Sequence, residues 1–266
     1  MDLSAVTEFA AAPGTAWRDG DAWLGGGTWL FSQPQPDVRR LLDLTAFGWP
    51  PLTETGDGLR VAATCTHAEL ARWQPAQRVH AATARLAGRC CDALLGSFKV
   101  RNAATVGGNI CLSLPAGPVT ALAASLDGVL TLEAPGGGTR QVAVTDFVTG
   151  DGLNALRPGE LLREEFLPAA ALRSRTAFRQ ASLSPVGRSA ALVIARRQAT
   201  GTVVTITAAT PRPVQFRFPE PPSEAEMTAA LTARELAYLD DVHGAALWRQ
   251  AMTRRLAGQA VAELRS

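Results

Sequence analysis

The sequence contains two short glycine-rich stretches, Gly25-Gly26-Gly27-Thr28 and Thr105-Val106-Gly107-Gly108-Asn109. Glycine adopts positive φ angles readily, and without a Cβ it lets backbone N–H groups approach an anion closely. The first stretch directly follows residues 21–24, which we predict to be a strand, so its amides would lie at the end of a sheet. A single stretch of this kind is weak support for a phosphate site, so the surrounding sequence is needed to judge whether the stretch binds phosphate.

Two common phosphate-binding motifs are absent from the sequence. No G-x-G-x-x-G opens a helix after a strand, as a Rossmann dinucleotide site requires, and no G-K-[ST] marks a P-loop. A third glycine run, Gly136-Gly137-Gly138, lies between apolar segments at residues 129–132 and 141–144. We predict a hairpin turn there.

Further strands and helices are predicted around the two stretches. Residues 37–44 and 59–63 have the apolar character of strands, and residues 76–95 repeat small and aliphatic side chains at helical spacing. Thr66 and Glu69 form a capping box, which predicts that a helix begins there.

The composition changes after Pro168. We predict an α+β fold with a first domain at residues 1–168 and a smaller C-terminal domain at residues 169–266, whose sheet is antiparallel. The elements expected in the second domain are strands at 178–182, 190–196 and 203–208, an irregular proline-rich segment at 216–222, a capping box at Ser223 and Glu226, and a closing helix at 245–264.

The composition is that of an ordinary globular protein, with 47% hydrophobic and 19% charged residues and a formal net charge of +2. So slight a charge does not indicate a nucleic-acid or membrane surface, and no apolar run approaches the roughly 20 residues of a membrane helix. Residues 1–13 lack the pattern of a secretory signal. We therefore expect a cytoplasmic protein with no nucleic-acid partner and no membrane span.

The four cysteines, Cys65, Cys90, Cys91 and Cys111, include no C-x-x-C pair, which argues against an iron–sulfur or structural zinc site. Cys65 and His67 have a spacing that could ligate a metal, but the other two histidines lie in unrelated contexts. Small buried thiols are the better interpretation, so we predict reduced cysteines and no metal site.

Residues 100–110, Val-Arg-Asn-Ala-Ala-Thr-Val-Gly-Gly-Asn-Ile, resemble the IRNxATIGGN signature of the FAD-binding subunit of molybdenum hydroxylases. This family includes xanthine dehydrogenase-type and carbon monoxide dehydrogenase-type enzymes. Residues 24–30 resemble its other phosphate loop, AGGTDL, and the matches continue in order along the chain. The further matches are Leu126-Asp127 to ALDA, Asp146-Phe147 to DFF, residues 156–162 to LxPGELL, and Asp240-Asp241 with residues 247–252 to DD…YRxxM.

The resemblance implies a two-part FAD-binding domain of the vanillyl-alcohol-oxidase (PCMH) type, with a subdomain boundary near residues 50–58, followed by the C-terminal domain of this family. Amides of both loops would hold the FAD pyrophosphate, and Thr28 and Asn109 would add side-chain hydrogen bonds. Some relatives attach flavin through a histidine in the first loop. Since none of the three histidines lies there, the resemblance implies non-covalent FAD.

The resemblance also implies that the chain is one subunit of an oxidoreductase complex. Electrons from a large molybdopterin subunit would pass through a small [2Fe–2S] subunit to FAD, and then to NAD, oxygen or another acceptor, in a dimer of heterotrimers. Two alternatives remain open: a stand-alone flavin oxidoreductase, and a non-catalytic assembly or scaffold relative with weakened FAD binding.

Three departures from the family pattern concern the pocket. Pro118 replaces an aspartate of SPxxD and so removes a polar contact to the adenosine part of FAD. Trp29 replaces another aspartate, and we expect it to pack rather than to be exposed for a partner. In place of KxxR near the flavin the chain has Gln180 and Leu183, and Arg179 or Arg188 are possible substitutes.

Other residues are assigned structural roles. Arg101 and Asn102 are expected to hold the second loop in shape, Glu160 to accept a hydrogen bond from nearby backbone, and His67 to be solvated in the first turn of a helix. No catalytic residue is predicted. The predicted FAD contacts are Leu24, Gly25, Gly26, Gly27, Thr28, Trp29, Thr105, Gly107, Gly108, Asn109, Leu161, Leu162 and Gln180.

Overall fold

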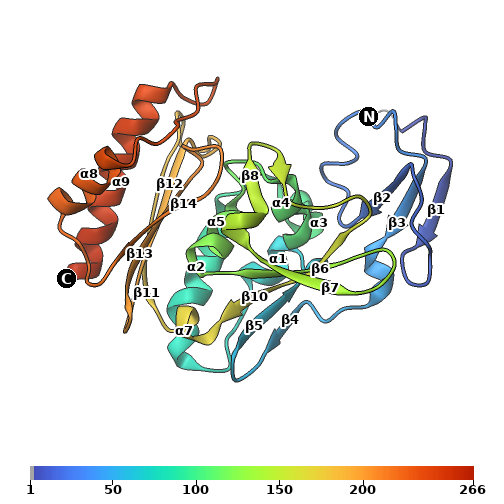
Figure 1. Cartoon of the computed structure of the whole chain (residues 1–266), viewed down its shortest axis with the longest axis horizontal. Coiled ribbons are helices and arrows are strands. Elements are labelled where there is room, and N and C mark those ends of the chain that lie inside the picture. Colours follow the sequence, from blue (N-terminus) through green and yellow to red (C-terminus); the bar gives the residue numbers. More distant parts are fainter. Residues whose placement is uncertain (1–2) are drawn as a thin grey trace.

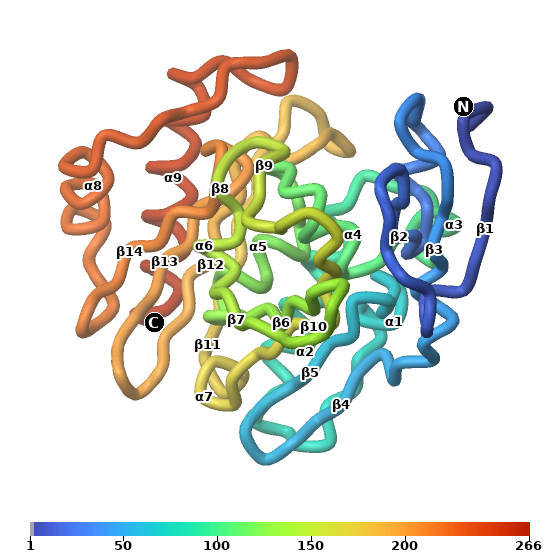
Figure 2. Tube along the Cα trace, turned by 45° about the vertical axis from the view of Figure 1, so that its right-hand side comes forward, coloured from blue at the N-terminus to red at the C-terminus, as the bar shows by residue number. Residues whose placement is uncertain are grey.

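The computed structural model describes residues 3–266 and confirms the predicted α+β fold. Figure 1 shows a sheet near the N-terminus at one end, a helix-covered sheet in the middle, and a third sheet backed by the last helices at the other end. The view in Figure 2 keeps the same order along the molecule.

The sheet at the N-terminal end is parallel, with strand order β1-β3-β2. Its core is small and joins Ala12, Leu42 and Leu44 to Leu161 of a later strand. The first glycine loop leaves this sheet directly after Leu24. The elements are β1 (Glu8–Ala11), β2 (Asp21–Leu24), β3 (Arg40–Asp43) and the 3₁₀ helix η1 (Leu44–Phe47).

The middle sheet is antiparallel, with strand order β4-β5-β10-β6-β7, and α1, α2, α4 and α5 belong to the same body. Its strands are β4 (Leu52–Glu54), β5 (Gly58–Ala62), β6 (Val129–Glu133), β7 (Thr139–Ala143) and β10 (Leu161–Pro168). The remaining elements are α1 (His67–Ala71), η2 (Arg78–His80), α2 (Ala81–Asp92), α3 (Phe98–Ala103), α4 (Val106–Leu112), α5 (Pro118–Ser125), α6 (Val144–Phe147), β8 (Val148–Gly150), β9 (Leu153–Asn154) and α7 (Ala169–Leu172).

The third sheet is an antiparallel meander, β11-β12-β13-β14. Every residue of β13 is buried, because α9 covers one face of the sheet and α2 and α5 contact the other. Apolar side chains of β12 alternate between these two cores, as a strand covered on both faces requires. The elements are β11 (Arg175–Ala181), β12 (Ala191–Gln198), β13 (Gly201–Thr207), β14 (Val214–Phe218), α8 (Glu224–Ala233) and α9 (Ala246–Arg265).

An ion-pair network joins the third sheet to the middle body. The guanidinium of Arg196, fully buried on β12, contacts the carboxylate of Asp127 just after α5. Arg217 on β14 donates to the other oxygen of the same carboxylate at 2.7 Å. The C-terminal sheet is therefore fixed against α5 by charge as well as by apolar packing.

The local sequence signals were good predictors of structure. Both capping boxes form, at Thr66 with Glu69 and at Ser223 with Glu226, and the hairpin at residues 136–138 joins β6 to β7. The closing helix is α9, as predicted.

Three predicted ranges were wrong in extent. The strand at 37–44 begins only at Arg40, and the helix at 76–95 is confined to α2 with a 3₁₀ turn before it. The segment at 216–222 begins inside β14, because it pairs with β13 despite the prolines that follow. The domain limits 1–168 and 169–266 stay a prediction, and Met1 and Asp2 of the first domain lie outside the described residues. Within residues 3–266, no helix is long and apolar enough to cross a membrane.

Candidate cofactor-binding site

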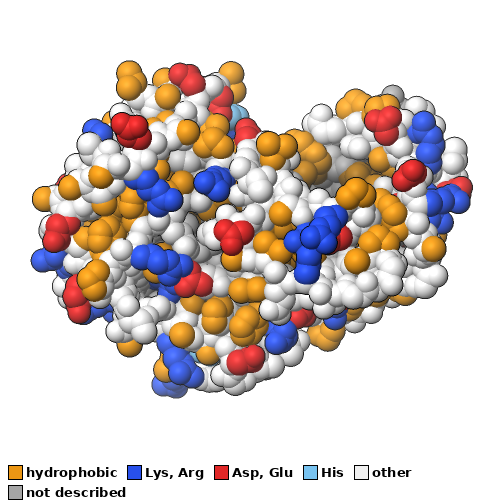
Figure 3. Space-filling model, viewed as in Figure 1, with side chains coloured by type: hydrophobic (Ala, Val, Ile, Leu, Met, Phe, Trp, Pro, Cys, Tyr) orange, Lys and Arg blue, Asp and Glu red, His pale blue; other side chains and the backbone are white. Residues whose placement is uncertain are grey.

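A cavity of about 620 Å³ opens where the N-terminal sheet meets the middle body, within the size range of small-molecule sites. Figure 3 shows the surface hollowed between these two parts, with hydrophobic side chains near the hollow. Both glycine loops line this cavity. The predicted contacts that line it are Leu24, Gly25, Gly26, Gly27, Thr28, Trp29, Thr105, Gly107, Gly108, Asn109, Leu161 and Leu162.

The first loop presents unpaired backbone donors. The amides of Gly26, Gly27 and Thr28 have no hydrogen-bond acceptor in the described part of the chain. Gly27 has φ +67°, which turns the chain after β2 in a conformation that glycine adopts without strain. The loop can therefore donate several hydrogen bonds to one anion in the cavity.

Close packing around the two loops explains why glycines stand in both. A Cβ on Gly26 would lie 1.6 Å from the carbonyl oxygen of Ala103, and one on Gly25 would lie 2.9 Å from Oγ1 of Thr105. On the second loop, a Cβ on Gly107 would lie 2.6 Å from the Cβ of Ala63. Each glycine thus allows a backbone approach that any larger residue would block.

The second loop begins α4 and uses most of its own amides. Oγ1 of Thr105 caps the helix by accepting from the amide of Gly108 at 3.1 Å. The amides of Val106 and Gly107 donate to the carbonyls of Cys65 and Ala63. In this conformation the unpaired amides therefore lie on the first loop, and contact between FAD and amides of both loops stays a prediction.

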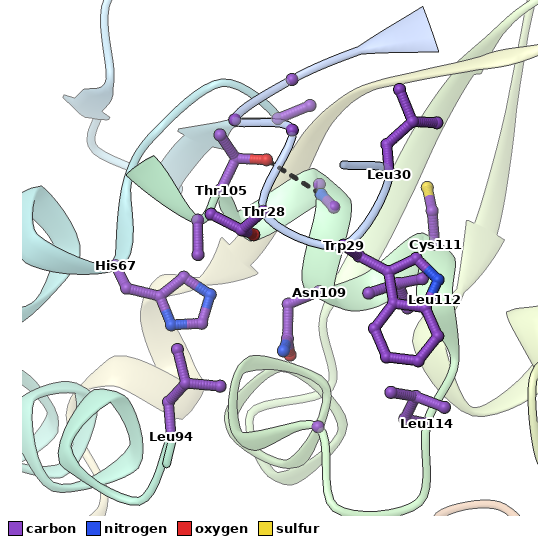
Figure 4. Close-up of a pocket in the computed structure, with 18 of the residues that line it drawn as sticks. Thr28, Trp29, Leu30, His67, Leu94, Thr105, Asn109, Cys111, Leu112 and Leu114 are labelled. Atoms are coloured by element: carbon purple, nitrogen blue, oxygen red, sulfur yellow. Dashed lines mark hydrogen bonds between the residues drawn. The ribbon is translucent and has the colours of Figure 1, made fainter. Parts of the chain in front are cut away.

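Asn109 connects the second loop to the next helix. Its Oδ1 accepts from the amides of Val119 at 3.1 Å and Thr120 at 3.4 Å, at the start of α5. Gly117, the N-cap of α5, has no side chain to do this. Asn109 thus supplies the missing cap, while its Nδ2 stays available on the cavity side (Figure 4).

The cavity wall also contains charged groups. Glu160 accepts from Arg140 at 2.8 and 2.7 Å and from the amide of Arg157 at 2.8 Å, which confirms the predicted bond to backbone. The Arg140 guanidinium, helped by the Arg157 amide, lowers the pKa of Glu160 to about 2. Arg188 is the one lysine or arginine among the described residues that line the cavity.

The family's missing lysine therefore has a single candidate replacement. Arg179 is paired with Glu263 at 2.6 Å and does not line the cavity, which leaves Arg188 of the two substitutes. Gln180 does not line it either, because its amide donates to Ser189 at 2.9 Å. A contact between Gln180 and FAD stays a prediction.

Two sequence-based interpretations of single residues were wrong. Trp29 is 45% exposed at the cavity rim, so it is not a packing residue. His67 is not solvated: it is buried and lines the cavity, and burial lowers its pKa to about 4. The bridge between Thr66 and Thr105 places it there. No local sequence pattern predicts this tertiary contact.

The cysteines are buried or half-buried thiols. Burial raises the pKa of Cys91 and of Cys111 to about 12, so both are neutral. Arg101 pairs with Asp92 at 2.6 Å, consistent with its predicted structural role. Across residues 3–266, no group of three or more His, Cys, Asp or Glu side chains is arranged to hold a metal ion.

Comparison with known proteins identifies the family. The FAD binding domain in molybdopterin dehydrogenase matches residues 6–170, which include both loops and every residue that lines the cavity except Arg188 and His243. The chain belongs to this family. FAD is accordingly its cofactor and its class is oxidoreductase, as the motifs predicted.

Individual relatives support this assignment. The chain is 37% identical over 87 residues to the nicotinate dehydrogenase FAD-subunit of Eubacterium barkeri, a match that covers 32% of this chain and 29% of the relative. Less than a third of that relative's length is thus matched.

Two solved structures share the fold over nearly the whole chain. Quinoline 2-oxidoreductase from Pseudomonas putida 86 has a TM-score of 0.80 at 18% identity, over 99% of this chain and 98% of that one. Reconstituted CO dehydrogenase from Oligotropha carboxidovorans has a TM-score of 0.78 at 19% identity, over 98% of each chain. These matches confirm the predicted fold.

Proposed function

We propose that the chain carries one non-covalent FAD as the electron-transferring subunit of a molybdenum hydroxylase complex. The observation that carries the proposal is the cavity between two interlocked glycine loops in a chain of this FAD-binding family. Electrons would arrive from [2Fe–2S] clusters in a small partner subunit, fed by a large molybdopterin subunit. They would leave to NAD, oxygen or another acceptor, and the cytoplasm is the proposed location.

The residues of the cavity fit FAD. Unpaired amides of the first loop suit a pyrophosphate, and aligned neutral donors can hold such an anion without a cluster of lysines. Leucines line much of the rest, which suits flat aromatic rings. The carboxylate of Glu160 is neutralised by Arg140 and so does not repel the phosphates.

The bound FAD supplies the redox chemistry, by accepting electrons and giving them to an acceptor. The protein places it and sets its surroundings. Arg188 puts positive charge in the cavity wall, and such a charge beside the flavin would favour its reduced, anionic form. Glu160 is ionised and held by Arg140, so it is not arranged as a general base.

We assign the contacts as follows. Gly26, Gly27 and Thr28 bind the pyrophosphate, with Thr105 and Asn109 beside it, and Leu161 and Leu162 lie against the flavin. The division at residue 168 and a dimer of heterotrimers belong to the same proposal.

The test is to purify the whole chain alone and together with the proteins that co-purify with it. We expect one FAD per chain, with flavin absorption near 370 and 450 nm, and reduction only when an iron–sulfur partner is present. A chain that rejects added FAD overturns the proposal. A chain that turns over a soluble donor alone, with no iron or molybdenum in any associated protein, overturns the subunit role and favours a stand-alone enzyme.

A further inference from the structure

One buried side chain in the cavity has polar atoms that the fold does not use. The imidazole of His67 is 0% exposed, and neither Nδ1 nor Nε2 has a partner in good hydrogen-bond geometry among residues 3–266, although the backbone of Thr105 lies close enough to favour the protonated ring. A buried polar group without a partner costs free energy, and such groups are few in native proteins. The free chain therefore contains an unfulfilled hydrogen-bonding group in the wall of its cofactor cavity.

His67 lies beside the phosphate-binding loops. Its backbone amide donates to the carbonyl of Ala104, directly before the second loop, which fixes the start of α1 against that loop. Figure 4 shows the imidazole pointing toward the cavity, with Thr28 above it and Asn109 across from it. The ring thus faces the same space as the first loop's unpaired amides.

The imidazole is closed off from bulk water in the free chain. Leu94 lies next to it in the irregular segment between α2 and α3 (Figure 4). Burial keeps His67 neutral, with one N–H donor and one acceptor nitrogen, and the nearby Arg101 charge also opposes protonation.

We infer that His67 is a binding residue for FAD, donating a hydrogen bond from its neutral imidazole to a phosphate or ribose oxygen next to the first loop. This inference rests on the proposed function. It assigns a role to a residue that has none in the sequence motifs, and it gives the buried imidazole in the cavity wall a partner.

The test compares two buried histidines. His80 is also buried (2% exposed), and its ring nitrogens also lack hydrogen-bond partners in the described chain, but it lies outside the cavity. His67→Leu, His67→Gln and His80→Gln are titrated with FAD by flavin fluorescence. We expect His67→Leu to bind FAD about tenfold more weakly, the size expected for one hydrogen bond. His67→Gln should retain most of the affinity, and His80→Gln should bind as the parent does.

A second measurement follows the imidazole signals in the parent chain, so it does not require a substituted protein to fold. The chain has three histidines, so ¹⁵N-histidine labelling gives three resolvable imidazoles. Saturation with FAD should move the His67 ring signals and leave those of His80 in place. An unchanged His67 spectrum, or parental affinity in His67→Leu, overturns the inference while the parent still binds FAD. Failure of the parent itself to bind FAD overturns the proposed function instead.

Discussion

Single residues determine whether the two loops can meet. Gly26 is the tightest point, because its α-carbon faces the backbone of Ala103 with no room for a methyl group. The requirement is one of space, since Gly26 does not have a positive φ. Substitution here tests the geometry of the pocket directly.

We predict that Gly26→Ala forces the loops apart. FAD affinity should fall at least tenfold, and the free energy of unfolding should fall by about 1–3 kcal/mol, as for overpacking elsewhere. Flavin fluorescence titration and urea denaturation measure the two effects. Gly56→Ala is the matched control, because a Cβ there meets nothing within 4 Å. Equal FAD affinity in both variants would show that the loop contact is not needed.

Arg188 is a second residue whose substitution can be tested, through its effect on the midpoint potential of the flavin. If its charge stabilises the reduced flavin, Arg188→Met should make the midpoint potential more negative, by about 30 mV for each 1.4 kcal/mol lost in a two-electron couple. A spectroelectrochemical titration of the FAD-loaded chain measures this shift. Arg212→Met, an exposed arginine outside the cavity, should leave the potential unchanged. A parental potential in Arg188→Met would contradict the assignment.

At the scale of elements, the pocket is built from ends of helices. Thr105 is the N-cap of α4, α1 begins at His67, and α5 begins at Pro118, and all three residues line the cavity. Pro118 fits the first position of a helix, where its missing N–H is not needed. The side chain that caps α5 comes from α4, through Asn109.

Substitutions at Asn109 separate capping from cofactor binding. Asn109→Ala removes the acceptor, so we expect a loss of about 1 kcal/mol in unfolding free energy and weaker FAD binding. Asn109→Asp keeps an acceptor and adds a charge that suits a helix N-terminus, but that charge repels a pyrophosphate. Thermal melts should therefore place the Asp variant near the parent, while FAD titration places it with the Ala variant or below. An Asp variant that binds FAD like the parent would exclude Asn109 from the phosphate site.

Some features of these elements could be predicted from the sequence, and others could not. Capping boxes were predicted because Thr66 and Glu69 lie within one helical turn of each other, and the loops were found because their glycines are contiguous. The buried environment of His67 depends on a bridge to Thr105, far along the chain.

Arg188 is a similar case. The motif comparison gave Gln180 on β11 as the predicted contact and Arg179 or Arg188 as possible substitutes, and of these it is Arg188, in the loop after β11, that lines the cavity. The choice among these candidates follows from tertiary packing, which no local sequence pattern predicts.

At the scale of the whole molecule, the central sheet contains one ionisable group that limits stability. Glu165 on β10 is 1% exposed, its Oε1 has no hydrogen-bond partner in the described chain, and burial raises its pKa to about 8. An unfolded glutamate has a pKa of about 4.3. The folded protein therefore binds an extra proton between these values.

The sign of the pH dependence follows from this difference. The contribution of Glu165 to stability is full below about pH 4.3 and is lost as the pH rises toward 8, at up to about 1.4 kcal/mol per pH unit. Glu165→Gln should flatten the dependence between pH 5 and 8 and be the more stable protein at pH 8. Denaturant melts across this range measure it, with Glu164→Gln, whose parent residue pairs with Arg60, as the control. Parallel pH profiles for parent and Glu165→Gln would refute the prediction.

The complete burial of α5 has a consequence for how the cofactor is loaded. All eight residues of this helix are buried, between α2 and α4 on one side and β12 and β13 on the other. Parting the C-terminal sheet from the body would expose them and break the contact of Arg196 with Asp127. FAD should therefore enter from solvent past Trp29, without a hinge motion, and the observed loading rate should rise in proportion to the FAD concentration.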